Sequence, residues 1–313
     1  MRISRREHEG FALLAVLWVI VGLASFAFVS SLATRNAIAS SHNRGDMLRA
    51  MWRANDCVER ARAAIGEALL ATERIDARIQ PGWSALDEVV RTSPIVTGVP
   101  CHVHLEAVGS RIDVNHADAE MLDALLRRLR IEEPLRDSMV DALLDWRDPD
   151  DIARPHGAER AWYAARGRLL PRNGAFANVR EIARVRGFEK MSGLDSVFTV
   201  ETGPVSLANA PLDVIAALPG MSDEVVARIA EERARGARVE DMATLAGALS
   251  PGARDRMLAR YSDLVHAATV ETDAWILEAR ADAGAPAVTV AVELRLVRAG
   301  DRAAVVRRRT WVS

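Results

Sequence analysis

The residues of this sequence with the clearest chemical potential are five aspartates within eleven positions, 141–151. Like charges at this density cost folding free energy unless something neutralises them. A hard cation such as Ca²⁺, which takes roughly six to eight oxygen ligands in loose geometry, would do so. The other interpretation is a solvated acidic loop, and the spacing alone leaves the two open. In that second case the aspartates pair in part with Arg147, Arg154 and Arg160.

No catalytic constellation accompanies this cluster. The sequence contains no GxxxxGK[ST] phosphate loop, no HExxH zinc helix and no GxSxG nucleophile elbow, and Lys190 is its single lysine. Cys101, His102 and His104 lie close together and suggest zinc, but no second group of ligands with metal spacing accompanies them. The sequence therefore favours a structural or assembly protein over an enzyme.

The elements that must position these residues begin with an apolar segment. Residues 10–34 contain no ionisable side chain, and residues 11–29 are almost wholly apolar. A helix of this length, at about 1.5 Å per residue, crosses a hydrocarbon core of about 30 Å. Arg2, Arg5 and Arg6 precede it and are expected to hold the amino end in the cytoplasm, with the rest of the chain on the other side.

Three interpretations of this segment compete. A cleaved secretory signal has an apolar stretch of only about 7 to 15 residues, so this one is too long. A plain single-pass anchor remains open. The third interpretation rests on Gly10, which stands directly before Phe11 with no polar spacer. An enzyme that cuts on the cytoplasmic side of an uncleaved anchor needs such a junction.

Composition and periodicity divide the rest of the chain. The 41 basic and 43 acidic residues exclude a strongly basic surface for nucleic-acid phosphates. Apolar residues at helical spacing extend the first helix to about Thr72. Short Ala- and Leu-rich helices are expected from about Asp113 to His266, with strands before and after them, which predicts an α+β domain with a helical insert. The predicted strands are Cys101–Val108, Ala274–Ala279, Ala287–Val297 and Ala303–Val312.

The predicted insert contains a helix-hairpin-helix signal. Asn115 and Asn209 each precede an apolar helix, where an Asn side chain can accept a hydrogen bond from a free backbone N–H group. The second copy continues as LPGMSDEVVARIAEERARG, similar to hairpins that grip DNA phosphates, but Ser222 replaces the usual second glycine. Glutamates accompany the arginines that follow, whereas phosphate binding needs uncompensated positive charge. A packing module is favoured, and a membrane-anchored, competence-type DNA-binding protein is the alternative.

The amino-terminal motif resembles a known family. Gly10 followed by FALLAVLWVI is similar to the type IV prepilin-like proteins, in which a dedicated peptidase removes the leader after glycine and methylates the new amino terminus. Most members carry glutamate at the fifth mature position, which is Ala15 here. One branch, the large minor pseudopilin K of type II secretion (the GspK family), lacks that glutamate. The acidic segment and the later stretches ANVREIARVRGF and VSLANAPLDVIAALPGM also resemble that branch.

The resemblance implies a pilin-like α+β fold. A long N-terminal transmembrane and stem helix is expected to pack on an antiparallel sheet, with a large all-α, helix-hairpin-helix or SAM-like insert. The expected segments are the leader 1–10, the transmembrane helix 11–34, the stem and first strands 35–112, the insert 113–266 and the C-terminal strands 267–313.

The resemblance also implies a role and partners. The expected role is to initiate and cap the tip of the periplasmic pseudopilus, for protein export across the outer membrane. The expected partners are the minor pseudopilins I and J, the prepilin peptidase and the inner-membrane assembly platform, with no nucleic acid. The protein is expected to be single-pass in the inner membrane, with its C-terminal domain in the periplasm.

Two structural sites are expected within the soluble part. Matching to the family's acidic motif implies a structural Ca²⁺, with Arg147 where the family usually has an apolar residue. In an oxidising compartment, Cys57 and Cys101 are expected to form one disulfide, which would contribute roughly 4 kcal/mol in the chain-entropy model. The candidate calcium ligands from the resemblance are Asp148, Asp150, Asp151 and Glu159.

Overall fold

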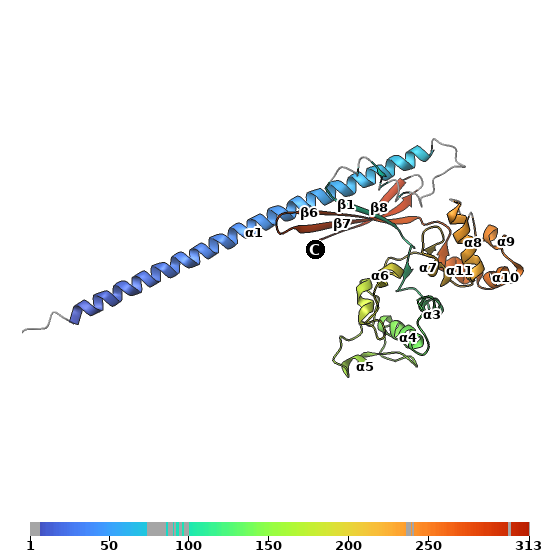
Figure 1. The fold of residues 1–313 in the computed structure, drawn as a ribbon, viewed down its shortest axis with the longest axis horizontal. Coiled ribbons are helices and arrows are strands. Elements are labelled where there is room, and N and C mark those ends of the chain that lie inside the picture. Colours follow the sequence, from blue (N-terminus) through green and yellow to red (C-terminus); the bar gives the residue numbers. More distant parts are fainter. Residues whose placement is uncertain are drawn as a thin grey trace, which may run out of the picture.

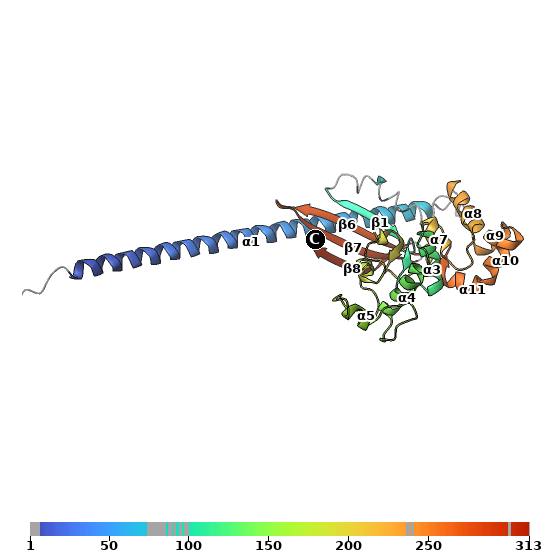
Figure 2. The same cartoon turned by 60° about the horizontal axis from the view of Figure 1, so that its bottom comes forward.

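The protein combines one long helix, a sheet and a helical insert. The structure is a computed structural model, and it describes residues 7–73, 86, 90, 92, 93, 96, 100–235, 239, 241–299 and 302–312. Residues 1–6 of the expected leader lie outside these ranges. In Figure 1 the sheet lies along the second half of the long helix, and the helices of the insert gather below and beyond the sheet. The turned view in Figure 2 shows the same arrangement.

Helix α1 (Glu7–Glu73) is continuous through the predicted transmembrane segment and the predicted stem. Within the described residues, it is the one helix long and apolar enough to cross a membrane, with a mean hydropathy of 2.5 over its most apolar 18-residue window. The helix is described as far as Glu73, so it includes the stem predicted to about Thr72. No helix-breaking residue separates the two parts, because neither proline nor a glycine cluster occurs between them.

The face of α1 that packs on the sheet is rich in alanine. Small side chains let the helix backbone approach the strands closely. The larger apolar residues Met47, Leu48 and Trp52 are instead exposed, although Met47 and Leu48 share the helical spacing that predicts the stem. A search for large apolar residues at helical spacing does not find this face, because the interface between α1 and the sheet consists mainly of small side chains. The buried residues of this face are Ala50, Ala54, Cys57, Val58, Ala61, Ala64 and Ile65.

The sheet has four strands in the order β1-β6-β7-β8, and every pairing in it is antiparallel. Alternation along β7 buries Val290, Val292, Leu294 and Leu296 in the same cluster as the alanines of α1. This confirms the half-buried sheet that the alternation predicts. The strands are β1 (His102–Ala107), β6 (Ala274–Ala283), β7 (Val288–Ala299) and β8 (Arg302–Val312).

The insert joins β1 to β6 and divides into two halves, each closed by a short parallel pair of strands. Strand β2 (Ile112–Asp113) pairs with β3 (Phe198–Thr199) around the first half. Strand β4 (Val205–Ser206) pairs with β5 (Ala268–Thr269) around the second. These two-residue strands carry no alternation that a sequence pattern could detect.

The first half of the insert contains four α-helices and one 3-10 helix. They are α3 (Ala119–Arg128), α4 (Leu135–Arg147), α5 (Arg160–Ala164), the 3-10 helix η2 (Val179–Arg184) and α6 (Leu194–Val197). The helices of the second half are α7 (Leu212–Ala216), α8 (Asp223–Ala234), α9 (Met242–Gly247), α10 (Pro251–Ala259) and α11 (Tyr261–Ala267).

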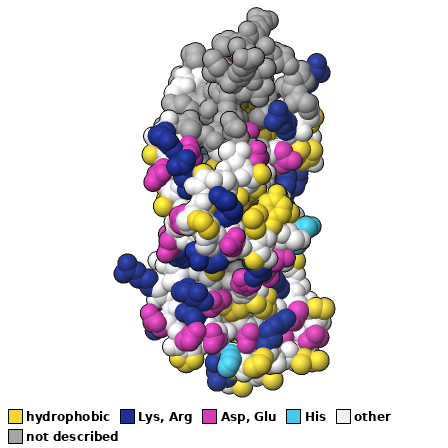
Figure 3. Space-filling model, turned by 90° about the vertical axis from the view of Figure 1, so that its right-hand side faces the viewer, with side chains coloured by type: hydrophobic (Ala, Val, Ile, Leu, Met, Phe, Trp, Pro, Cys, Tyr) yellow, Lys and Arg dark blue, Asp and Glu magenta, His cyan; other side chains and the backbone are white. Residues whose placement is uncertain are grey.

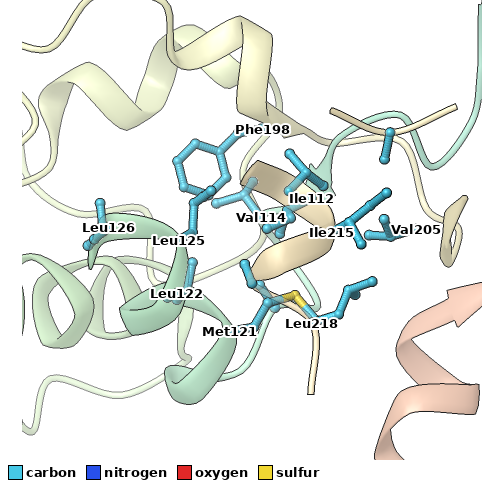
Figure 4. Close-up of a cluster of buried hydrophobic side chains, with 14 of the residues drawn as sticks. Ile112, Val114, Met121, Leu122, Leu125, Leu126, Phe198, Val205, Ile215 and Leu218 are labelled. Atoms are coloured by element: carbon cyan, nitrogen blue, oxygen red, sulfur yellow. The ribbon is translucent and has the colours of Figure 1, made fainter. Parts of the chain in front are cut away.

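One hydrophobic cluster unites the two halves of the insert. In Figure 4, Leu122 and Leu125 of α3 lie near Phe198 of β3, and Ile215 of α7 lies on the other side of the same cluster. Because this cluster is separate from the one beneath α1, the insert has its own core. The predicted α+β fold with a helical insert is therefore confirmed.

The predicted role of asparagine at two helix starts was wrong. Helix α3 is capped by Asp118, whose carboxylate accepts a hydrogen bond from the N–H of Met121. Asn115 instead accepts a hydrogen bond from the N–H of Phe176 and donates one to its carbonyl oxygen. Asn209 accepts one from the hydroxyl of Ser206. Both asparagines therefore stabilise loops before the helices rather than the helix ends.

Candidate metal centre on the acidic loop

The acidic loop, residues 148–159, connects α4 to α5. Trp146 at the end of α4 is buried and donates a hydrogen bond from its ring N–H to Glu181, at 3.2 Å. Its ring meets that of Tyr163 on α5 edge to face, with centroids 5.2 Å apart, and stacks with Phe176. Aromatic pairs of this kind stabilise their partners beyond area burial alone. They fix the two ends of the acidic loop beside each other.

Three carboxylates meet at this loop. Asp145, Asp148 and Glu159 each place one oxygen within 4.8 Å of the others. Asp145 is fully buried and accepts hydrogen bonds from the N–H of Ala158, at 2.9 Å, and from the guanidinium of Arg154, at 2.6 Å. The same guanidinium also contacts Asp148. One arginine therefore serves two of the three carboxylates, Asp145 and Asp148.

Several oxygens around the loop lack a hydrogen-bond donor. One oxygen of Asp148 and both oxygens of Glu159 are buried without a partner, and so is the side-chain oxygen of Asn173. A buried, unpartnered polar atom costs about 1 to 3 kcal/mol, and a charged one costs more. Clustered orphan oxygens of this kind are the donor set that a hard cation such as Ca²⁺ prefers. The residues present therefore fit a calcium ion.

The protonation equilibria reflect the same deficit of positive charge. Burial, followed by the neighbouring carboxylates of Asp145 and Asp148, raises the pKa of Glu159 to about 7. Burial also raises the pKa of Asp145, against the hydrogen bonds from Arg154. A cation bound between these groups would favour their charged forms and lower both pKa values.

The structure brings together two of the four predicted calcium ligands, Asp148 and Glu159. Asp150 is exposed and accepts a hydrogen bond from the N–H of Ile152, at 2.8 Å, which is a local turn. Asp151 is also exposed and accepts a hydrogen bond from the amide of Asn173, at 2.9 Å. Neither belongs to the group of three carboxylates.

Sequence reasoning missed two residues of this centre. Asp145 stands three positions before Asp148 on α4, so a helical reading of DALLDWRD could have placed both at the same end of the helix. Asn173 lies far along the chain, and its amide donates to the carbonyl oxygen of Asp150, at 2.5 Å. No local pattern connects Asn173 to the acidic segment.

Gly157 allows the loop to close over Asp145. A Cβ atom at this position would lie 1.9 Å from a carboxylate oxygen of Asp145, closer than any non-bonded contact allows. The Gly157-Ala158-Glu159 segment therefore needs glycine for a close approach, and the next N–H group binds that same carboxylate.

The basic residues around the loop separate into two groups. Arg147 does not pair with the aspartates, and this part of the solvated-loop interpretation was wrong. Its guanidinium donates hydrogen bonds to the carbonyl oxygens of Val114 and Ala117. Arg154 and Arg160 do reach the acidic loop, the latter with its nitrogen 3.5 Å from Asp151.

The remaining predicted site residues lie on α1 and β1. Cys57 of α1 and Cys101, just before β1, form a disulfide with Cα atoms 6.6 Å apart. It ties the helix to the edge of the sheet, and it leaves Cys101 without a thiol for a zinc site with His102 and His104. The backbone of Gly10 and Phe11 lies within α1, and Ala15 lies on the exposed apolar part of that helix.

Helix α1 and the antiparallel sheet packed on it define a pilin-like subunit with a helical insert. Residues 103–193 match the family model described as type II secretion system (T2SS), protein K. This range contains β1 except its first residue, and all three carboxylates of the acidic loop. The resemblance to the protein K family that the sequence indicates is thereby confirmed.

A solved structure shares the fold. The chain is similar to one in the crystal structure of the GspK-GspI-GspJ complex from the enterotoxigenic Escherichia coli type 2 secretion system. The TM-score is 0.60 at 16% identity, over 88% of this chain and 100% of that one. A comparison with curated proteins finds no match.

Proposed function

We propose that this chain is a minor pseudopilin of the type II secretion system that initiates and caps the tip of the periplasmic pseudopilus. The observation that carries the proposal is the pilin-like helix and sheet interrupted, between β1 and β6, by an insert with its own core in a segment that matches protein K. Repeated along a tightly packed fibre, such an insert would collide with its neighbours. A single copy at the end of the fibre avoids this collision.

The residue at the fifth position of the mature chain supports the tip position. In the family's assembly scheme, a glutamate at this position pairs with the free amino terminus of the subunit above. An unpaired carboxylate in an apolar helix bundle would be costly. A subunit with nothing above it has no amine to neutralise, so Ala15 suits the end of the fibre. Its own amino terminus at Phe11 remains free to recruit a glutamate-bearing subunit from below.

The partners follow from the same proposal. The solved structure that shares the fold is a complex of three proteins, GspK, GspI and GspJ, so we expect this chain to assemble with minor pseudopilins of the I and J types. The prepilin peptidase would cut between Gly10 and Phe11, and the assembly platform would take up the product. The chain would then span the inner membrane once, with its sheet and insert in the periplasm.

Two measurements test this function. Mass spectrometry of the membrane-extracted protein should show a methylated amino terminus at Phe11, and co-purification should recover a stoichiometric complex with two other minor pseudopilins. The Ala15→Glu variant should not become a shaft subunit. Many copies along isolated pili, a homopolymer, or an intact Met1 in cells that contain the peptidase would overturn the proposal.

We also propose that the acidic loop binds a structural Ca²⁺. The residues that would hold it are Asp145, Asp148 and Glu159, with Asn173 as a neutral ligand and the predicted Asp150 and Asp151 at the rim. The support is the set of buried oxygens without donors. At a hundredfold excess of Ca²⁺ over its Kd, binding to the folded state alone adds about 2.7 kcal/mol of stability.

A thermal melt with and without chelator tests the calcium proposal. Chelation should lower the Tm of the wild-type chain and leave that of Asp148→Asn unchanged. The Asp141→Asn variant is a matched control, because Asp141 accepts a hydrogen bond from the N–H of His156 and lies outside the carboxylate group. It should keep the calcium response. A wild-type melt that chelator does not shift would show that the acidic loop is only solvated.

DNA binding, the alternative from the sequence, has less support around the hairpin between α7 and α8. Arg233 donates hydrogen bonds to the carbonyl oxygens of Leu207 and Ala210, so these donors are not free to bind a phosphate. A Cβ at Gly220 would lie 3.2 Å from atoms of α10, so the hairpin packs against that helix. Figure 3 shows acidic and basic side chains interspersed over this end of the insert. Phosphate binding requires positive charge without such compensation.

A further inference from the structure

Another surface of the insert, centred on Trp162 of α5, carries three arginines, and for two of them the described residues show no carboxylate partner. The guanidinium carbons of Arg166, Arg186 and Arg168 lie 4.1, 5.2 and 5.7 Å from the centroid of the Trp162 ring. Since all three surround one ring, they share one small area of surface. Cation–π attraction offsets part of their mutual repulsion. We call Trp162 and these three arginines, together with Leu169 and Leu170, the Trp162 patch.

The hydrogen bonds of the patch leave two of its charges uncompensated. Arg168 pairs with Glu189. Arg166 donates a hydrogen bond to the carbonyl oxygen of Trp162, at 3.1 Å, and no described carboxylate pairs with it. Arg186 likewise donates only to carbonyl oxygens, those of His156 and Gly157. A carbonyl oxygen orients a guanidinium without neutralising it.

The imbalance extends along the surrounding segment. Residues 160–190 contain eight basic and two acidic residues, in a chain whose 41 basic and 43 acidic residues nearly balance as a whole. One of the two acids, Glu181, is buried against Trp146 and the N–H of Ala177. The positive charge around Trp162 is therefore not an average property of this protein surface.

Exposed aliphatic side chains adjoin the charged ones. Leu169 and Leu170 follow Arg168 directly and are 64% and 44% exposed. Trp and Arg are the residue types most enriched where protein interfaces concentrate their binding energy. A ligand that complements the patch would carry negative groups for the arginines and an apolar group for the leucines.

We propose that the Trp162 patch binds an acidic segment of a partner protein. Carboxylates would take the free donors of Arg166 and Arg186, since the planar guanidinium fork matches a carboxylate in two parallel hydrogen bonds. An apolar residue of the same segment would cover Leu169 and Leu170. This inference does not depend on the position of the chain in a pseudopilus.

The geometry favours a protein segment over a lipid surface. Arg186 is held by two carbonyl oxygens and Arg168 by Glu189, so their guanidinium groups are fixed before any partner arrives. Pre-organised donors reduce the entropy lost on binding a ligand of defined shape. Attraction to an anionic membrane needs only net charge near the surface and no such order.

Fluorescence anisotropy on the full chain in detergent tests the proposal. The probe is a labelled peptide of alternating Glu and Leu, and the control probe has Gln in place of Glu. We expect the Glu peptide to bind at least about tenfold more tightly than the Gln peptide, because charge-assisted hydrogen bonds are the stronger ones. Equal binding of the two peptides would overturn the proposal.

Charge-matched variants locate the interaction. Arg166→Gln should weaken binding of the Glu peptide about tenfold, and Arg166→Gln with Arg186→Gln should weaken it further. Arg130→Gln removes the same charge from the exposed loop between α3 and α4 and should have little effect. Vesicles with and without phosphatidylglycerol form a second arm. Arg166-dependent binding to the anionic vesicles without binding of the peptide would overturn the proposal in favour of lipid.

Discussion

Two acidic centres of this protein, around Glu201 and around Glu159, differ in how their negative charge is compensated. Glu201, in the link between β3 and β4, accepts hydrogen bonds from Arg295 of β7, at 2.9 Å, and from Arg307 of β8, at 2.6 Å. Glu159 of the acidic loop has no donor on either oxygen. Burial raises the pKa of both groups, but at Glu201 the arginines more than reverse this and lower it.

Glu201 forms a contact in which protein groups alone compensate the charge, whereas both oxygens of Glu159 and one of Asp148 lack donors from the protein. Glu201 lies between the two halves of the insert and pairs with arginines on the adjacent strands β7 and β8 of the sheet, so its ion pairs fix the insert against the pilin-like domain. Around Glu159 a single guanidinium, that of Arg154, serves Asp145 and Asp148 and does not pair with Glu159. The first centre is complete without a ligand, and the second is the one for which we propose a bound cation.

The largest effect is expected from Gly157→Ala, because the new methyl group would overlap the carboxylate of Asp145. Closing the loop would then be impossible without moving a buried charge, and we expect a loss of about 4 kcal/mol in the free energy of unfolding. Gly174→Ala is the matched control, since a Cβ there meets only the flexible side chain of Arg172, at 3.9 Å. Chemical denaturation of the full chain measures both. Equal stabilities for the two variants would contradict the close approach.

The next effect is a dependence on pH in calcium-free protein. Because the pKa of Glu159 is raised from 4.5 to about 7 on folding, the folded state binds its proton more tightly than the unfolded state. That contribution to stability is fully present below about pH 4.5 and is lost as the pH rises through about 7. The loss should amount to about 2 to 3 kcal/mol, and saturating Ca²⁺ should compensate for it.

Glu159→Gln provides the control for this prediction. The amide cannot ionise, so this part of the pH dependence should disappear. Denaturation curves from pH 4 to pH 9 in chelator make the comparison. If the wild type and Glu159→Gln lose stability in parallel over this range, Glu159 is not the group responsible.

Glu201→Gln should show the opposite pH dependence and no response to calcium. Removing the charge leaves Arg295 and Arg307 without their main partner, and we expect a loss of about 2 kcal/mol near pH 7. Because its pKa is lowered on folding, the wild-type contribution is present above the ordinary value and is lost as the pH falls below it. A calcium-dependent stability for Glu201→Gln, or a loss on substitution that shrinks as the pH rises, would remove the contrast between the two centres.

The sequence predicts the fold well where periodicity carries the signal. The membrane-length helix, the stem to about Thr72 and the strands of the sheet all follow from hydropathy and alternation. The packed face of α1 does not, because alanine dominates it and a pattern of large apolar residues points to Met47 and Leu48 instead. The short parallel pairs that close the halves of the insert are two residues long and leave no periodic signal.

Of the four calcium ligands predicted from the sequence, only two belong to the group of three carboxylates, because local sequence patterns do not show tertiary contacts. Charge density locates the acidic loop, and Asp148 and Glu159 follow from the family's motif. Which oxygens converge depends on tertiary contacts: the buried helix end that carries Asp145, and the return of the chain at Asn173. Asp150 and Asp151 are carboxylates of the same loop, but both are exposed, because Asp150 is held in the turn at Ile152 and Asp151 by the amide of Asn173.

The smallest effect comes from the residues on which the sequence and the structure differ most. Asp150→Asn and Asp151→Asn should change the calcium-free stability by no more than about 0.5 kcal/mol, because both side chains are exposed and surface pairs contribute little. If they lie only at the rim of the site, each should weaken calcium binding a few-fold through lost long-range attraction, whereas Asp148→Asn and Glu159→Gln remove a ligand and should abolish it. Isothermal titration with Ca²⁺ measures the four variants on one scale. Should Asp150→Asn abolish binding as completely as Asp148→Asn, the loop rearranges around the ion so that Asp150 becomes a ligand. The two centres would then differ in conformation as well as in charge. The ion pairs of Glu201 are formed in the protein alone, whereas the acidic loop would take its final conformation only when Ca²⁺ binds.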